Sequence, residues 1–156
     1  GVHSGGNFIS KKTDRIEYIE KLLKKKLIEE IKVEGFKALL YIPYKADEMT
    51  SSIKERVSFI APLDNLIWDR DLIHTLFGFY YRWEVYTPVK KREYGYYVLP
   101  MIYKSEFIGR VEFKKHRNND SLEIINIWPE PNVKRTKKLD SKINIAFNRF
   151  EKYLKT

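Results

Sequence analysis

Apolar residues near the start of the chain recur at helical spacing and place Ile16, Ile19, Leu22, Leu23 and Leu27 on one face. This stripe predicts an amphipathic helix of about four turns, with Thr13 as its N-cap. Two short apolar runs follow on either side of Glu34-Gly35 and predict a β-hairpin. A helix followed directly by a hairpin is the closing half of a winged helix.

This pattern divides the first part of the chain into three segments. We assign residues 1–9 to a tag or loop remnant, because they are glycine-rich and start without methionine. Residues 10–44 are the C-terminal half of a winged helix, and residues 45–55 are a linker without periodicity. The helices that precede the hairpin in a winged helix are absent, so we expect a fragment.

Short strands predominate from residue 56 onward. Patterns of period two predict strands at 53–60, 80–86, 94–103, 107–115 and 122–128. A short helix is expected to begin at Asp69 or Asp71 and to end at Gly78, a residue suited to the C′ position. The final helix has a single apolar stripe, made of Leu139, Ile143, Ala146, Phe147, Phe150 and Leu154. Residues 56–156 are therefore expected to form a β-barrel-like domain with a C-terminal helix. The predicted fold class is α+β, a partial winged helix followed by a small antiparallel β-barrel or sheet.

Charge narrows the choice of partner. The chain has 156 residues and a formal net charge of +9, which favours a polyanion such as nucleic acid or an acidic membrane surface. Residues 131–156 contribute eight Lys/Arg against Asp140 and Glu151, a net +6. Such a localised excess fits phosphate contact, although a solvated helix face explains it equally well.

Composition argues against several classes of chemistry. The chain has no Cys, and its three His have no paired spacing, so we expect neither a metal site nor a cofactor. No apolar run approaches the roughly 20 residues of a membrane span, and no signal peptide is visible. We expect a cytoplasmic protein associated with the nucleoid.

Acidic residues offer a weak case for catalysis. Asp64, Asp69 and Asp71 resemble paired carboxylates for acid–base work. Helix capping and local ion pairing explain them better. His74 lies among apolar residues and is expected to be a partly buried helix residue.

Two basic loops offer a better case for binding. Lys90, Lys91 and Arg92 precede Tyr94 and Tyr96, which combines phosphate-seeking charge with rings for stacking. In the alternative, alternate tyrosines face the core with only their hydroxyls in water. The second loop contains Lys114, Lys115 and Arg117, and its alternative is a solvated turn.

Four runs of sequence resemble one known family. They are Ala61-Pro-Leu-Asp-Asn-Leu-Ile-Trp-Asp-Arg70, Phe77-Gly-Phe-Tyr-Tyr-Arg-Trp-Glu-Val-Tyr86, Pro88-Val-Lys-Lys-Arg-Glu-Tyr-Gly-Tyr-Tyr-Val-Leu-Pro100 and Gly109-Arg-Val-Glu-Phe-Lys114. They resemble the C-terminal region of the winged-helix DNA glycosylases, which include AlkZ- and YcaQ-type enzymes that excise alkylated or crosslinked bases. The resemblance implies winged helices closed by a C-terminal β-barrel that helps to grip duplex DNA.

The resemblance also implies that catalytic residues lie elsewhere. The family's catalytic signature is Gln-x-Gln or Gln-x-Asp, and this chain contains no Gln. We therefore assign no catalytic residue and expect no glycosylase activity from this chain alone. The expected partners are double-stranded DNA and the missing N-terminal winged-helix domains, with self-association through exposed apolar surface. The predicted DNA-binding residues are Lys90, Lys91, Arg92, Tyr94, Tyr96, Lys114, Lys115 and Arg117. The predicted structural signature is Asp64, Trp68, Asp69, Arg70 and Arg82.

Two other functions remain open on sequence alone. One is a non-catalytic nucleic-acid-binding or regulatory protein with the same domain. The other is an interaction module whose aromatic residues pack on the missing domains.

Overall fold

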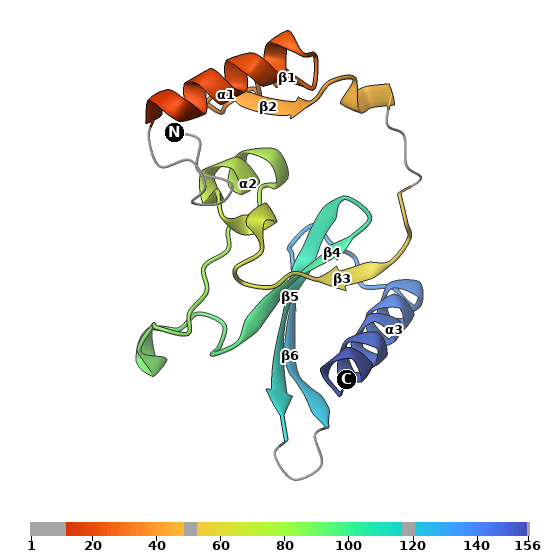
Figure 1. The fold of residues 1–156 in the computed structure, drawn as a ribbon. Coiled ribbons are helices and arrows are strands. Elements are labelled where there is room, and N and C mark those ends of the chain that lie inside the picture. The colour runs from red at the N-terminus through yellow and green to blue at the C-terminus, as the bar shows by residue number, and fades with distance from the viewer. Residues whose placement is uncertain (1–11, 49–52, 117–120, 156) are drawn as a thin grey trace.

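The fold is α+β, with helices and two antiparallel sheets (Figure 1). The structure is a computed structural model and describes residues 12–48, 53–116 and 121–155. The elements, with η for a 3-10 helix, are α1 (Lys12–Lys24), β1 (Ile28–Ile31), β2 (Leu40–Pro43), η1 (Ala46–Glu48), β3 (Val57–Phe59), η2 (Asn65–Ile67), α2 (Arg70–Phe77), η3 (Val89–Lys91), β4 (Val98–Tyr103), β5 (Glu106–Lys115), β6 (Leu122–Pro129) and α3 (Lys137–Leu154).

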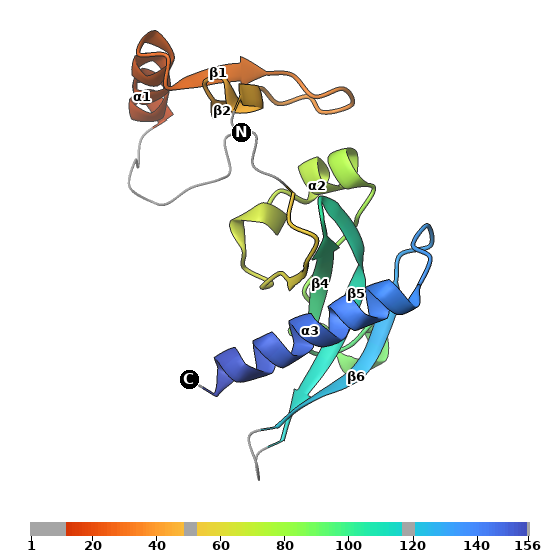
Figure 2. The same cartoon turned by 90° about the vertical axis from the view of Figure 1, so that its right-hand side faces the viewer.

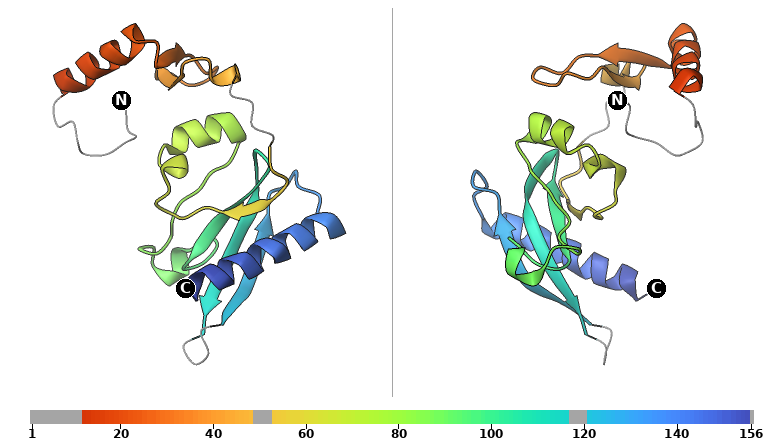
Figure 3. Two further views of the ribbon diagram at one scale, coloured as in Figure 1. Left: turned by 45° about the vertical axis from the view of Figure 1, so that its right-hand side comes forward. Right: turned by 90° about the vertical axis from the view of Figure 1, so that its left-hand side faces the viewer.

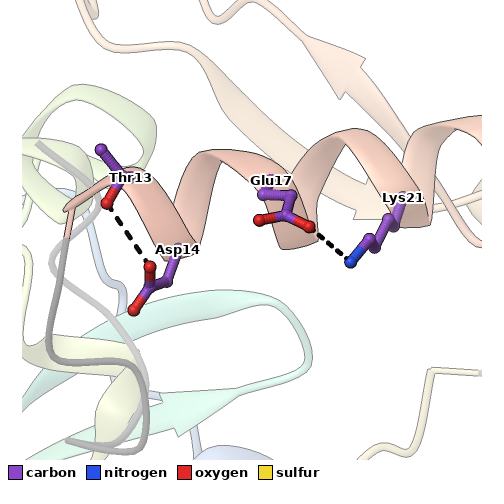
Figure 4. A network of polar contacts seen from close by, with 4 residues as sticks. All are labelled: Thr13, Asp14, Glu17 and Lys21. Carbon is purple, nitrogen blue, oxygen red and sulfur yellow. Dashed lines mark hydrogen bonds and ion pairs between the residues drawn. The ribbon is translucent and has the colours of Figure 1, made fainter.

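The predicted first helix is present, but its N-cap was wrong. Thr13 lies inside α1, and its hydroxyl donates to the Asp14 carboxylate at 3.4 Å (Figure 4). One turn further on, Lys21 pairs with Glu17 on the exposed surface of the helix. The helix ends with Lys26 in the left-handed region, where its N–H donates to the Leu23 carbonyl. A positive φ at this position is typical of a helix C-terminus, so the helix stops before the predicted Leu27.

The predicted hairpin is also present. β1 and β2 pair antiparallel, with Ile28 opposite Pro43 and Ile31 opposite Leu40. Residues 32–39 connect the strands, and Gly35 has a φ of 79° in this connection. The order of helix and hairpin is the one that the sequence predicts for residues 10–44.

The second sheet is open. Its strands follow the order β3-β4-β5-β6, and each neighbouring pair is antiparallel. Within the described residues no strand closes this sheet, so the barrel that the sequence suggested is corrected to its alternative, a sheet. Gly109 lies in β5 between both neighbours, and a Cβ there would come within 2.3 Å of the Trp128 carbonyl oxygen. This close approach requires glycine.

Different elements cover the two faces of the four-stranded sheet. α3 lies across one face (Figure 2), where Leu139, Ile143 and Ala146 pack on the strands in the larger core cluster. The other face meets α2 and the segment that follows it (Figure 3). The second core cluster lies there and includes Ile73, Phe79, Tyr81 and Phe107. The apolar stripe of the last helix is thus confirmed as its packing face.

The predicted strand 80–86 is wrong, and the predicted strand 94–103 is shorter than expected. Residues 80–86 and 94–97 have no ladder partner, and only Val98–Tyr103 of the latter region forms a strand. The alternation of side chains is misleading here, because Tyr81 and Glu84 lie on opposite faces of the predicted strand and yet both are buried. Glu84 points inward because its carboxylate accepts hydrogen bonds from backbone N–H groups. His74 is exposed rather than partly buried, because it lies on the solvent side of α2. None of the helices in the described part of the chain is long and apolar enough to cross a membrane.

Candidate nucleic-acid interface

Residues 86–97, here called the basic loop, connect the second core cluster to β4. Its first half contains η3 and projects from the body of the molecule (Figures 1 and 3). Lys90, Lys91 and Arg92 lie in or next to this short helix. The position of these cations depends on how the rest of the loop is held.

The Glu84 side chain fixes the second half of the basic loop through hydrogen bonds to its backbone. Its carboxylate accepts hydrogen bonds from the backbone N–H groups of Glu93 and Tyr94 at 2.9 Å and of Gly95 at 3.3 Å. Glu84 is only 9% exposed. Burial alone would raise the pKa of Glu84, but the three N–H donors and the charge of Arg82 outweigh it and lower that pKa. The carboxylate is therefore ionised and fixes three consecutive amides.

A second carboxylate continues the same attachment. Glu112, from β5, accepts a 2.8 Å hydrogen bond from the backbone N–H of Tyr96. Gly95 leaves room for it, since a Cβ at residue 95 would come within 2.4 Å of the Glu112 carboxylate. Four successive amides, 93 to 96, are thus bound by two acidic side chains.

The three cations of the basic loop differ in their engagement. The Arg92 Nε donates to the Thr87 carbonyl at 2.9 Å, and its guanidinium lies 5.0 Å from the centre of the Tyr96 ring. Lys90 and Lys91 are exposed, and neither ammonium group has a partner among the described residues. The two lysines are therefore the cations of this loop that can meet a phosphate without breaking an existing contact.

The tyrosines of the loop separate into packed and exposed residues. The Arg110 guanidinium lies 4.4 Å from the centre of the Tyr94 ring, and Trp128 makes an edge contact with that ring. Tyr96 is 54% exposed. Tyr97 is 42% exposed and contacts Trp83 edge to face. Tyr94 therefore packs on the sheet, as the alternative interpretation expected, whereas Tyr96 presents a ring to solvent.

Arg110 is the central contact beneath Tyr94. It is 7% exposed, pairs with Glu130, and donates to the Tyr80 carbonyl. Its guanidinium also lies 4.5 Å from the centre of the Phe79 ring, so it sits among two aromatic rings and two oxygen acceptors. These contacts make it a structural cation that is unavailable to an external anion.

The second predicted basic segment lies at the end of β5. Lys114 and Lys115 are exposed, and the neighbouring His116 contacts Glu123 at 2.7 Å. Arg117 lies outside the described residues. Val98 pairs with Glu112, so β4 begins close to the end of β5 that carries the two lysines.

Four of the eight cations in residues 131–156 are already engaged. Arg135 pairs with Asp140, Lys138 with Glu55, and Lys155 with Glu151. Arg149 donates to the Val57 carbonyl at 2.9 Å. This internal use reduces the charge that α3 can offer to a partner.

Two of the predicted signature residues are helix caps. Asp64 accepts from the Leu66 N–H and caps η2, while Asp69 accepts from the Leu72 N–H and caps α2. Trp68 is 50% exposed between these two helices, and Arg70 begins α2 with an exposed side chain. Arg82 is exposed and lowers the pKa of Glu84 from nearby. Within the described residues no three His, Asp or Glu side chains come together as a metal site.

Sequence reasoning missed the residues that hold the loop. The sequence pattern places Glu84 in the predicted strand 80–86 and assigns no role of its own to Glu112 or Arg110. The available signal was a glutamate and an arginine flanked by buried apolar residues, because such charges require partners when they are buried.

These features define a small α+β domain with an ordered basic loop. Residues 7–152 match the family of AlkZ-like DNA glycosylases. The chain belongs to this family, which confirms the family that the sequence resembles. That the chain corresponds to the family's C-terminal region stays a prediction. No solved structure matches the chain.

Proposed function

We propose that this chain binds duplex DNA as part of a DNA glycosylase-like repair protein, with Lys90 and Lys91 as its principal phosphate contacts. The observation that carries the proposal is the basic loop: Lys90 and Lys91 have no partner among the described residues, and they directly precede a stretch, residues 93–96, whose backbone is fixed by Glu84 and Glu112. A fixed loop loses little conformational freedom on binding, which favours affinity. Family membership supports DNA as the polyanion.

Further contacts extend this surface. Lys114 and Lys115 are exposed at the end of β5, close to the start of β4, and are proposed to contact the backbone of the same duplex. Arg117, which lies outside the described residues, belongs to the same proposal as the next predicted cation along the chain. Arg92 and Tyr96 act as a stacked pair that offers a flat, cationic surface to a sugar or base.

Salt titration tests the proposal. Binding of the 156-residue chain to a labelled duplex is measured by fluorescence anisotropy across a range of salt concentrations. Replacing Lys90 and Lys91 by Ala removes two phosphate contacts, so the slope of log Kobs against log[salt] falls by about 1.8. The matched control replaces Lys24 and Lys25, two consecutive exposed lysines at and just beyond the end of α1, and leaves the slope within about 0.5 of wild type.

If the slope fell equally in both variants, the binding would depend on overall charge and not on this loop. If the slope stayed unchanged in the loop variant, Lys90 and Lys91 would not be phosphate contacts. A complete absence of duplex binding would exclude the function itself. Circular dichroism of each variant checks that the fold is retained.

Base release is not expected from this chain alone. Its sequence contains no Gln, so the Gln-x-Gln or Gln-x-Asp signature implied by the resemblance has no counterpart here. Incubation with alkylated duplex DNA, followed by alkaline cleavage of abasic sites, tests this point. Strand breaks above the level without protein would contradict it.

A second proposal concerns residues 10–44. The order α1, β1, β2 supports their assignment to the closing half of a winged helix. α1 also exposes apolar side chains, which are Ile16, Tyr18, Leu22 and, just beyond its end, Leu27. This surface supports docking of further winged-helix domains or self-association. Light scattering at increasing concentration distinguishes a monomer from a self-associating chain.

A further inference from the structure

The outermost part of the basic loop carries apolar side chains. Tyr86 is 89% exposed and Val89 is 74% exposed. These are the highest values among the large hydrophobic side chains of the described residues. Only Thr87 and Pro88 separate them, so the two side chains belong to one turn, here called the tip (residues 86–91). Exposure of this degree has no role in packing the domain.

The tip is a built turn. The Thr87 N–H donates to the Glu84 carbonyl at 2.9 Å, and the Lys91 N–H donates to the Pro88 carbonyl at 2.8 Å. Arg92 closes the turn through its bond to the Thr87 carbonyl. Trp83 supports it from below, with its ring centre 6.0 Å from that of Tyr86. The exposed side chains are thus presented on a backbone with its own hydrogen bonds.

The charge beside the tip identifies its partner. Lys90 and Lys91 belong to the same turn and have no partner among the described residues. An apolar projection flanked by cations complements a DNA groove, in which stacked bases lie between two rows of phosphates. Proteins that bend or open DNA insert apolar side chains between base pairs in this way.

We propose that Tyr86 and Val89 insert between neighbouring bases of the duplex while Lys90 and Lys91 hold the flanking phosphates. This inference rests on the proposed function and adds what the loop does to the DNA. Insertion requires unstacking, which costs less where stacking is already interrupted. The tip therefore gives the protein a preference for mismatched or gapped sites over intact duplex.

Two measurements test the insertion. The first is the ratio of affinities for a duplex with a central mismatch and for its matched counterpart. The second is the fluorescence of 2-aminopurine beside the mismatch, which rises when the base loses its stacking neighbour. Wild type is expected to prefer the mismatch by roughly tenfold and to raise the fluorescence, since unstacking accounts for a large share of the insertion cost. The variant Tyr86→Ser/Val89→Ser is expected to lose both effects, with a preference within about twofold.

The control variant removes two similarly exposed apolar side chains that lie outside the basic loop. Tyr153 is 72% exposed and Leu63 is 67% exposed, so Tyr153→Ser/Leu63→Ser deletes comparable surface away from the loop. This variant is expected to keep the preference and the fluorescence change. Near-ultraviolet circular dichroism verifies that both double variants keep the fold.

The outcomes separate insertion from binding. Duplex binding with a salt slope that depends on Lys90 and Lys91, but without preference or fluorescence change, overturns the insertion and leaves the proposed function in place. Equal weakening for both duplexes in the tip variant also overturns it, because the tip would then touch DNA without entering the stack. Absence of duplex binding removes both proposals, and leaves the tip as a contact for another protein.

Discussion

The Glu84 carboxylate accepts a 2.9 Å hydrogen bond from the backbone N–H of Tyr94, ten residues later in the chain. Together with the bonds from the N–H groups of Glu93 and Gly95, this bond attaches the basic loop to Glu84, which directly follows the second core cluster in the chain. One buried acid thus links the packed part of the domain to its exposed lysines. The consequences for stability and for binding can be measured separately.

Replacing Glu84 by Gln should reduce both stability and affinity. The amide group has one acceptor oxygen and no charge, so the three N–H groups are incompletely satisfied and unfolding becomes easier by roughly 2 kcal/mol. Duplex affinity should fall about fivefold, because the loop must then be ordered on binding. The salt slope should stay unchanged, since both lysines remain. Urea unfolding and anisotropy provide the measurements.

A matched control separates position from charge. Glu20→Gln removes one negative charge from the exposed surface of α1, and should leave stability unchanged while raising affinity slightly. If Glu84→Gln behaves like Glu20→Gln, the carboxylate does not hold the loop.

Acid should abolish the contribution of Glu84. Its pKa is lowered in the folded protein, so the unfolded chain takes up the proton first as the pH falls. The stabilisation is therefore fully present above the unfolded value of about 4.3 and disappears as the pH falls through the lower, folded value. The difference in unfolding free energy between wild type and Glu84→Gln should be constant from about pH 6 to 8 and shrink below about pH 4. A difference that grew toward acid pH would reverse the assigned sign.

Local features of this fold were predictable, whereas the attachment of the loop was not. Asp69 and Gly78 bound α2 as expected, because a cap and a left-handed C′ residue act within one turn of the helix. The apolar stripe of α3 was equally predictable, because it follows from helical spacing alone. The non-strand course of residues 80–86 depends on Glu84 meeting amides nine to eleven residues away, and such contacts leave no periodic signal. For the same reason the sequence did not predict that the Tyr94 ring packs against Arg110.

Gly95→Ala should test the fit between the loop and β5. The new Cβ would meet the Glu112 carboxylate and displace it from the Tyr96 N–H, at a cost of about 1 kcal/mol. In the background of Glu112→Ala the same substitution should be nearly neutral, because the obstacle is gone. A double-mutant cycle by urea unfolding gives this coupling.

Gly78→Ala provides the comparison for that cycle. Gly78 has a φ of 62° and open space around its Cα, so its cost is conformational and of about 1 kcal/mol. The Gly78→Ala cost should be the same with and without Glu112. Coupling of Gly78 to Glu112, or additivity between Gly95 and Glu112, would contradict the steric explanation.

Arg110→Met should separate structural from DNA-contacting cations. The substitution keeps an unbranched apolar chain between the rings of Phe79 and Tyr94 but leaves Glu130 and the Tyr80 carbonyl without their donor. Loss of one partner from a buried ion pair is costly, and we expect roughly 3 kcal/mol of destabilisation. The double variant Arg110→Met/Glu130→Gln should recover part of that loss, because the orphaned charge is removed as well.

Arg110 and the two lysines of the tip should differ in their effect on duplex binding. Arg110 is buried and fully engaged, so its removal should leave the salt slope unchanged at temperatures where the variant is folded. Replacing Lys90 and Lys91 by Ala should reduce the slope with little effect on unfolding, since exposed charges without partners contribute little to stability. If Arg110→Met reduced the slope as the double lysine variant does, the positive charge that meets the phosphates would have to include the core of the domain, and the assignment of the basic loop as the contact would be wrong.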